Sequence, residues 1–131
     1  MTTSRPATAT LRRQALVVED EFLIAAMLKQ MLAELGLPVC ATADSADAAI
    51  RLAQQHLPAL VLMDVRLKGS ADGVDAALAI RGSVGSAIIF ITGSRDPDTV
   101  RRIEEEPSFQ VLFKPFLFEQ LREAVGTVLS P

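Results

Sequence analysis

Apolar residues gather in short unbroken runs along the chain, and each run ends at a polar or charged residue. A short continuous apolar run is typical of a strand that is buried on both faces of a sheet. We therefore expect strands at 14–18, 38–43, 60–64, 87–91 and 110–113. Four of these runs lead directly into a residue with reactive chemistry: Glu19, Asp64, Thr92 and Lys114.

The segments between the expected strands carry the features of helices. Apolar residues at helical spacing place one face of a helix at Ile24, Met27, Leu28, Met31 and Leu35. Ser45 and the pair Asp96-Pro97 are typical of helix starts, because the polar side chain caps free N–H groups. The predicted helices cover 21–35, 45–55, 74–81, 97–105 and the segment from 117 onward, and Gly69 and Gly73 punctuate a loop over 65–73.

Strand and helix alternate five times, which predicts an α/β fold with a doubly wound parallel sheet covered by helices on both faces. In such a sheet the carboxyl ends of the strands lie along one edge, where ligands bind. The acidic, hydroxyl and ammonium groups that follow the strands should therefore meet there.

Composition narrows the class of protein. A chain of 131 residues with 50% hydrophobic and 22% charged residues is expected to form one domain, here 14–131, behind a flexible tail over 1–13. The net charge of −3 without a basic stripe argues against direct binding of nucleic acid. The single cysteine, Cys40, excludes an internal disulfide. Without an apolar leader or span, we expect a soluble cytoplasmic protein with no membrane association.

Like charges crowd where the first strand meets the first helix, at Glu19, Asp20 and Glu21. Acidic residues complement a helix N-terminus, which accounts for Glu21 but less well for the two residues that end a buried strand. Mg²⁺ prefers oxygen ligands and would relieve the repulsion. Asp64, from the neighbouring strand, could complete the site.

Asp64 is also a candidate nucleophile. A carboxylate can attack phosphorus and form an acyl phosphate, provided that charges and hydrogen-bond donors stabilise the phosphoryl oxygens. Lys114 could supply the charge and Thr92 the donor.

The motifs Val17-Val18-Glu19-Asp20-Glu21, Leu62-Met63-Asp64, Phe90-Ile91-Thr92-Gly93 and Phe113-Lys114-Pro115-Phe116 together resemble the receiver domain of two-component response regulators, of the stand-alone type. The resemblance covers residues 14–130 and implies a flavodoxin-like (βα)5 fold with strand order 2-1-3-4-5. It implies that a histidine kinase or phosphotransfer protein phosphorylates Asp64, that Thr92 and Lys114 contact the phosphoryl group, and that the Lys114–Pro115 peptide is cis. It places Mg²⁺ on Glu19, Asp20, Asp64 and the backbone carbonyl of Arg66.

The same resemblance implies how a signal leaves the domain. The surface of the fourth helix, fifth strand and fifth helix would contact a downstream protein, and the domain could form a homodimer on phosphorylation. The protein would not be an enzyme, apart from catalysing its own aspartyl phosphorylation and dephosphorylation.

Three positions depart from the family pattern. Glu19 stands where many relatives have aspartate, and its longer side chain could reach the metal through water. Val111 occupies a position where an aromatic ring often turns inward on activation. Arg66 stands at the mouth of the pocket, where it could pair with an acid or the phosphoryl group, or simply be solvated.

Other functions remain as alternatives. A receiver that is never phosphorylated could act as a fixed adaptor, since the residues only permit the chemistry. A metal-dependent aspartyl phosphohydrolase fits less well. Enzymes of this kind that resemble haloacid dehalogenases need a second aspartate two residues after the nucleophile, and Arg66 occupies that position here. A flavodoxin-like cofactor site needs a loop that binds phosphate after the first strand, and the acidic loop here would repel it.

Overall fold

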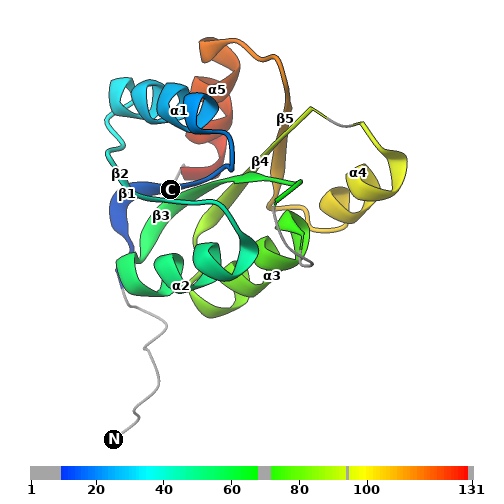
Figure 1. Ribbon diagram of the computed structural model, residues 1–131, viewed down its shortest axis with the longest axis horizontal. Coiled ribbons are helices and arrows are strands. Elements are labelled where there is room, and N and C mark those ends of the chain that lie inside the picture. The colour runs from blue at the N-terminus through cyan, green and yellow to red at the C-terminus, as the bar shows by residue number, and fades with distance from the viewer. Residues whose placement is uncertain (1–9, 68–71, 94, 130–131) are drawn as a thin grey trace, which may run out of the picture.

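The computed structural model describes residues 10–67, 72–93 and 95–129. These residues form a five-stranded parallel sheet with the order β2-β1-β3-β4-β5, as predicted (Figure 1). The strands are β1 Arg12–Val18, β2 Val39–Ala43, β3 Pro58–Asp64, β4 Ala87–Thr92 and β5 Gln110–Phe113. Of the expected tail, residues 1–9 lie outside the described part of the chain, as does Gly69.

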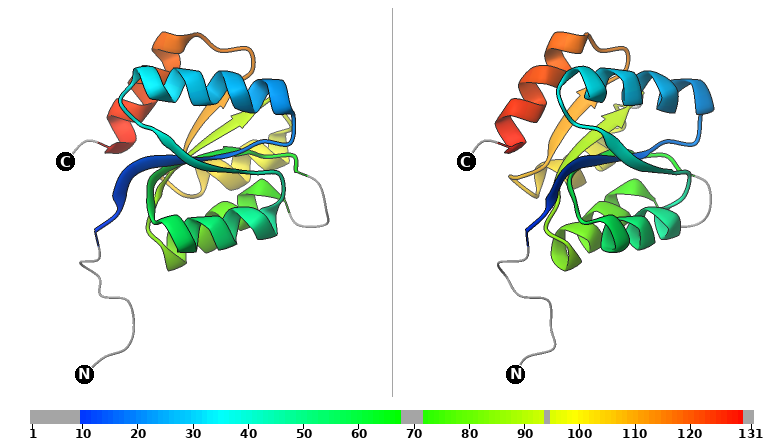
Figure 2. Two further views of the ribbon diagram at one scale, coloured as in Figure 1. Left: turned by 60° about the vertical axis from the view of Figure 1, so that its left-hand side comes forward. Right: turned by 90° about the vertical axis from the view of Figure 1, so that its left-hand side faces the viewer.

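Helices cover both faces of the sheet (Figure 2). One layer holds α1 and α5, and the other holds α2, α3 and α4. The helices are α1 Phe22–Glu34, α2 Ala46–His56, α3 Gly73–Ser83, α4 Pro97–Glu104 and α5 Phe118–Leu129. None of the helices among the described residues is long and apolar enough to cross a membrane.

Each strand contributes to two hydrophobic cores, because successive side chains point to opposite faces. Leu16 and Val18 pack with α2, α3 and α4, whereas Ala15 and Val17 pack with α1 and α5. All four are at most 1% exposed. This burial on both faces explains why the strands are continuous apolar runs, and it holds their carboxyl ends in a fixed row.

Two strands begin earlier than the sequence predicts. β1 begins at Arg12 rather than at residue 14, and β3 begins at Pro58 rather than at residue 60. The Arg12 N–H donates to the Leu57 carbonyl at 2.8 Å, and Arg12 pairs with Pro58 in register. Part of the expected tail is therefore strand, although Arg12 is polar and exposed.

The cap residues set the helix starts. The Ser45 hydroxyl accepts a hydrogen bond from the Ala48 N–H at 3.2 Å, as predicted. Asp96 accepts one from the Thr99 N–H at 3.1 Å and starts α4 at Pro97. α3 begins at Gly73, one residue before the predicted start, because Asp72 accepts a hydrogen bond from the Asp75 N–H at 2.9 Å.

The predicted buried face of α1 is wrong in part. The buried residues of α1 are Ala25, Leu28 and Leu32, whereas Met27 is 48% exposed. Phe22 and Leu23, at the start of the helix, are 82% and 80% exposed. The helix is apolar on more than one face, so the spacing of its apolar residues does not predict which face is buried.

Candidate functional site

The residues that follow four strands meet at one edge of the sheet. Asp64 and Thr92 are the last residues of β3 and β4, and Glu19 and Lys114 come directly after β1 and β5. An open pocket of ≈ 620 Å³ lies there, and its lining residues are Asp20, Glu21, Ile24, Asp64, Arg66, Thr92, Gly93 and Lys114. Glu19 is buried and contacts Lys114. The sheet edge thus brings together residues that are far apart in the sequence.

Three carboxylates form an acidic cluster at this edge of the sheet. Oxygen atoms of Glu19, Asp20 and Asp64 all lie within 4.8 Å of one another. Glu19 is 4% exposed and Asp64 is 8% exposed, while Asp20 is half-buried. Like charges this close repel, and a hard divalent cation is the usual remedy in proteins. The donor set therefore fits Mg²⁺, with carboxylate oxygens as its ligands.

The Asp64 carboxylate is held at both oxygens. Oδ1 accepts a hydrogen bond from the Arg66 N–H at 3.0 Å, and Oδ2 lies 3.6 Å from Lys114 Nζ. Desolvation in the pocket raises the pKa of Asp64 to about 6, and the charge of Glu19 adds to the rise. The Arg66 N–H and the Lys114 ammonium oppose it. A carboxylate with this pKa is mostly ionised at neutral pH and can act as a nucleophile.

Lys114 joins the two buried acids. Its Nζ donates a hydrogen bond to Glu19 Oε1 at 3.0 Å and lies 3.6 Å from Asp64 Oδ2. Burial lowers the pKa of Lys114, but the hydrogen bond from Nζ to Glu19 and the charge of Asp64 more than offset it and raise the pKa overall. Lys114 is therefore a fixed positive charge beside the carboxylate that would carry a phosphoryl group.

The backbone fixes where Lys114 and Thr92 stand. The Lys114 N–H donates to the Thr92 carbonyl at 2.8 Å, and the Lys114–Pro115 peptide is cis, as the family resemblance implied. Thr92 is 1% exposed, and it lines the same pocket as Asp64. The ammonium and the hydroxyl thus come from neighbouring strands whose ends are tied together.

Glu19 makes two contacts that the sequence does not indicate. Its Oε1 accepts from Lys114, and its Oε2 accepts from the Glu21 N–H at 3.2 Å. The carboxylate therefore anchors both the lysine and the start of α1. The longer side chain, which looked like a departure from the metal-binding pattern, is what reaches the ammonium in this structure.

Gly73 shapes the site, although the sequence marked it only as a loop residue. Its N–H donates to the Val65 carbonyl at 2.9 Å, which folds the segment after Asp64 back onto the strand. A Cβ at this position would lie 2.2 Å from the Asp64 carbonyl oxygen. Only glycine allows this approach without a shift of the backbone, and a lone glycine in a polar loop gives no hint of it.

Arg66 and Val111 can now be placed. Arg66 is exposed and lines the pocket, and its backbone N–H holds Asp64. Val111 is partly buried and packs against the core on the α2–α4 side. An aromatic ring does occur nearby on β5: the Arg95 guanidinium lies over the Phe113 ring, 4.0 Å from its centroid. Arg95, which precedes α4, thus contacts β5.

Comparisons with known proteins agree with this geometry. The family model described as "Response regulator receiver domain" matches residues 15–126. The transcriptional regulatory protein PdtaR of Mycobacterium tuberculosis is 35% identical over 124 residues, which are 95% of this chain and 60% of PdtaR. The chain therefore spans less than two thirds of the length of that relative.

Two solved structures show the same fold. The signal receiver domain of a modulated diguanylate cyclase from Desulfovibrio desulfuricans is 34% identical, with a TM-score of 0.82, covering 88% of this chain and 92% of that domain. The receiver domain of the response regulator PhyR from Erythrobacter litoralis is 28% identical, with a TM-score of 0.79, covering 91% of each chain.

Proposed function

The chain belongs to the response regulator receiver domain family, and we propose that it accepts a phosphoryl group on Asp64 from the phosphohistidine of a sensor histidine kinase or phosphotransfer protein. The observation that carries this proposal is the convergence of Glu19, Asp20, Asp64 and Lys114 at one edge of the sheet. A nucleophilic carboxylate, ligands for a metal and a fixed cation are the parts that phosphoryl transfer needs.

The proposed step exchanges one bond to phosphorus for another. A carboxylate oxygen of Asp64 attacks phosphorus, and the phosphorus–nitrogen bond of the donor breaks, leaving its electron pair on the imidazole. Asp64 Oδ2 faces Lys114, and Oδ1 is engaged by the Arg66 N–H. Lys114 Nζ, already near Oδ2, can neutralise charge on the transferred group. The Thr92 hydroxyl can donate to a phosphoryl oxygen.

Mg²⁺ fits the acidic cluster and would be held by Glu19, Asp20, Asp64 and the backbone carbonyl of Arg66. When bound, it screens the repulsion between the carboxylates and the phosphoryl oxygens. The chain itself keeps Asp64 oriented through the Arg66 N–H and keeps Lys114 in place through Glu19.

The signal would leave through the surface formed by α4, β5 and α5. In the proposal, Thr92 moves toward the new phosphoryl group and draws the segment between β4 and α4 after it. That shifts a two-state surface toward the form that binds a downstream protein. The transcriptional role in the name of PdtaR belongs to that longer protein. A homodimer formed on phosphorylation, and a cytoplasmic location, stay predictions.

Chemical phosphorylation tests the proposal without knowledge of the kinase. The protein is incubated with acetyl phosphate and Mg²⁺, and intact mass reports the addition of one phosphoryl group. We expect incorporation that survives acid but is lost to base or hydroxylamine. Asp64→Asn should abolish it, whereas Asp47→Asn, which changes an exposed carboxylate in the first turn of α2, should not.

The outcome separates the alternatives. Equal incorporation into the Asp64→Asn variant would overturn the assignment of the acceptor. No incorporation into the folded wild-type protein, from either acetyl phosphate or a panel of phosphorylated kinases, would favour the unphosphorylated adaptor. Continuous release of phosphate from added monoesters would favour the phosphohydrolase, since the proposed protein has no turnover beyond its own phosphorylation and dephosphorylation.

A further inference from the structure

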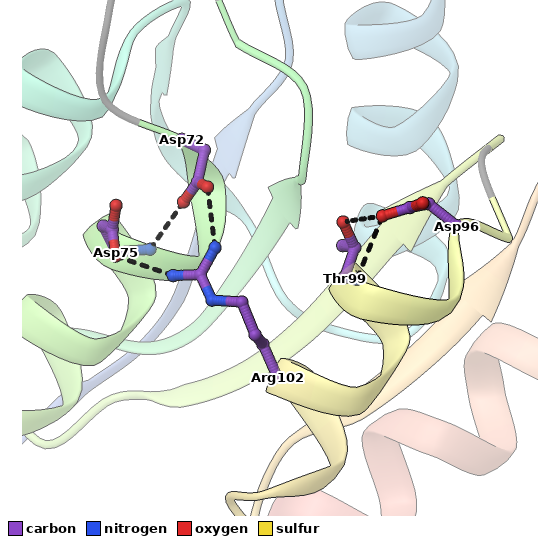
Figure 3. Close-up of polar contacts among 5 residues, drawn as sticks. All are labelled: Asp72, Asp75, Asp96, Thr99 and Arg102. Carbon is purple, nitrogen blue, oxygen red and sulfur yellow. Dashed lines mark hydrogen bonds and ion pairs between the residues drawn. The ribbon is translucent and has the colours of Figure 1, made fainter.

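Few buried side chains attach α4 to the rest of the domain. All of its residues are described, and only Ile103 among them is buried. The other side chains are mostly polar, and Asp96 and Thr99 satisfy the helix start locally (Figure 3). A helix held by one buried residue depends more than the others on its polar contacts for its position.

Arg102 provides such a contact, to a different helix. Its Nη1 lies 2.8 Å from Asp72 Oδ2, and its Nη2 lies 2.7 Å from Asp75 Oδ1 (Figure 3). The planar guanidinium fork thereby joins α4 to the N-terminus of α3. Arg101, on the same helix, pairs instead with Asp98 one turn away. We call the contact of Arg102 with Asp72 and Asp75 the Arg102 latch.

Asp72 divides its two oxygens between the two helices. Oδ1 accepts from the Asp75 N–H and caps α3, and Oδ2 accepts from Arg102. Partial burial raises the pKa of Asp72, but the Asp75 N–H and the Arg102 guanidinium outweigh it and lower the pKa overall. The side chains of Arg102 and Asp72 are 40% and 42% exposed, so the latch is weak enough to open.

The α3 end of the latch is tied to the phosphoacceptor. Asp72 precedes Gly73, whose N–H donates to the Val65 carbonyl at 2.9 Å. Gly73 also packs so tightly on Asp64 that a Cβ would lie 2.2 Å from its carbonyl oxygen. Gly73 therefore connects the backbone around Asp64 to the start of α3, where the carboxylates that hold Arg102 lie.

We infer that the Arg102 latch holds α4 in its unphosphorylated position, and that opening it is coupled to occupation of Asp64 by a phosphoryl group. This inference rests on the proposed function. Arg102 is a positioning residue, since it acts through Asp72 and the start of α3. The coupling must be reciprocal: if a phosphoryl group favours the open latch, removing the latch strengthens binding at the phosphoryl site.

The first test measures the latch alone, in the unphosphorylated protein. Hydrogen exchange of α4 amides is compared in wild type, Arg102→Gln and Arg101→Gln. Both variants lose one positive charge from the same helix, but only the first loses the contact to α3. We expect exchange to be faster in Arg102→Gln, on the order of twofold to fivefold, because an exposed ion pair stabilises a structure only modestly. Arg101→Gln should stay near wild type.

A second variant approaches the latch from its other side. Asp75→Asn removes one latch carboxylate and leaves the cap residue Asp72 unchanged, so it should accelerate exchange in α4 in the same direction. Equal exchange in Arg102→Gln and Arg101→Gln would overturn the latch, because the contact to α3 would then contribute nothing to holding α4.

The second test measures the coupling with beryllofluoride and Mg²⁺, an analogue of the bound phosphoryl group, followed by NMR. We expect Arg102→Gln to bind it more tightly than Arg101→Gln, by about twofold to fivefold, which is the range that the loss of an exposed ion pair allows. Equal affinities would overturn the coupling. If wild type binds no beryllofluoride and takes no phosphate from acetyl phosphate, the proposed function fails and the coupling with it, while the exchange comparison still decides whether the latch holds α4.

Discussion

Lys114 lies between two buried carboxylates and contacts one of them more closely. Its Nζ lies 3.0 Å from Glu19 Oε1 and 3.6 Å from Asp64 Oδ2. This difference depends on side-chain length and rotamer. The position of these residues after apolar runs predicts that they meet at one edge of the sheet, but it does not predict which of them pair.

The raised pKa of Asp64 has a consequence for stability. The folded-state pKa of about 6 lies above the ordinary value of 3.8, so the ionised carboxylate destabilises the folded protein. This cost is fully present above about pH 6 and absent below about pH 4. Asp64→Asn should therefore raise the free energy of unfolding at pH 7, by on the order of 1–3 kcal/mol.

Urea unfolding in EDTA at several pH values checks this prediction. The gain from Asp64→Asn should shrink as the pH falls from about 6 to about 4. Asp47→Asn, on the exposed first turn of α2, serves as the control and should change stability little. A gain that grows on acidification would mean that the sign assigned to Asp64 is wrong.

A second prediction concerns the buried pair of Glu19 and Lys114. Lys114→Met leaves the Glu19 carboxylate, whose side chain is 1% exposed, without its ammonium partner. That should cost about 1–3 kcal/mol of stability. Adding Glu19→Gln removes the stranded charge, so the double variant should lose less than the sum of the two single losses. Strictly additive losses in urea unfolding would show that the pair is not coupled.

At the scale of the elements, strands were easier to predict than helix faces. A strand buried on both sides needs only an apolar run, whereas a helix needs the right stripe among several. The cap of α2 at Ser45 was predictable, because a serine before an apolar face has few other roles. The exposed positions Phe22, Leu23 and Met27 of α1 were not predictable, since only the packing of the helix against β1 and β2 reveals which face is covered.

Alanine substitutions at two glycines of α3 form a matched pair of variants that tests the close approach of Gly73 to Asp64. Gly73→Ala places a Cβ 2.2 Å from the Asp64 carbonyl oxygen, so it should destabilise the protein by roughly 1–3 kcal/mol. Gly82→Ala meets no atom within 4 Å and should stabilise the helix, by about 0.5–1 kcal/mol. Thermal or urea unfolding of both variants provides the measurement, and a neutral Gly73→Ala would contradict the tight contact.

At the scale of the whole molecule, alternation of strands and helices predicted a parallel sheet but not the order of its strands. That order came from the resemblance to a family, and the structure confirms it. The order matters because it places β1 beside β3, so that the acids after β1 lie next to Asp64. Periodicity along a chain contains no information on which strands become neighbours.

Metal binding should stabilise the whole fold through the acidic cluster. A ligand that binds only the folded state raises the free energy of unfolding by about 1.4 kcal/mol when its concentration is ten times its Kd. Mg²⁺ should therefore raise the Tm of wild type in a manner that depends on its concentration. Asp20→Asn should reduce this shift, whereas Asp98→Asn, an exposed carboxylate on α4, should not. Equal shifts in both variants would remove Asp20 from the metal site.

The central claim is that the pocket directs a phosphoryl group to one particular carboxylate, and locating the modified residue tests it most directly. The protein is treated with acetyl phosphate and Mg²⁺, the acyl phosphate is converted with hydroxylamine to a stable hydroxamate, and peptides are sequenced by mass spectrometry. The account predicts the hydroxamate on Asp64, and its loss when EDTA replaces Mg²⁺. A hydroxamate on Glu19, Asp20 or any other carboxylate instead of Asp64 would contradict it.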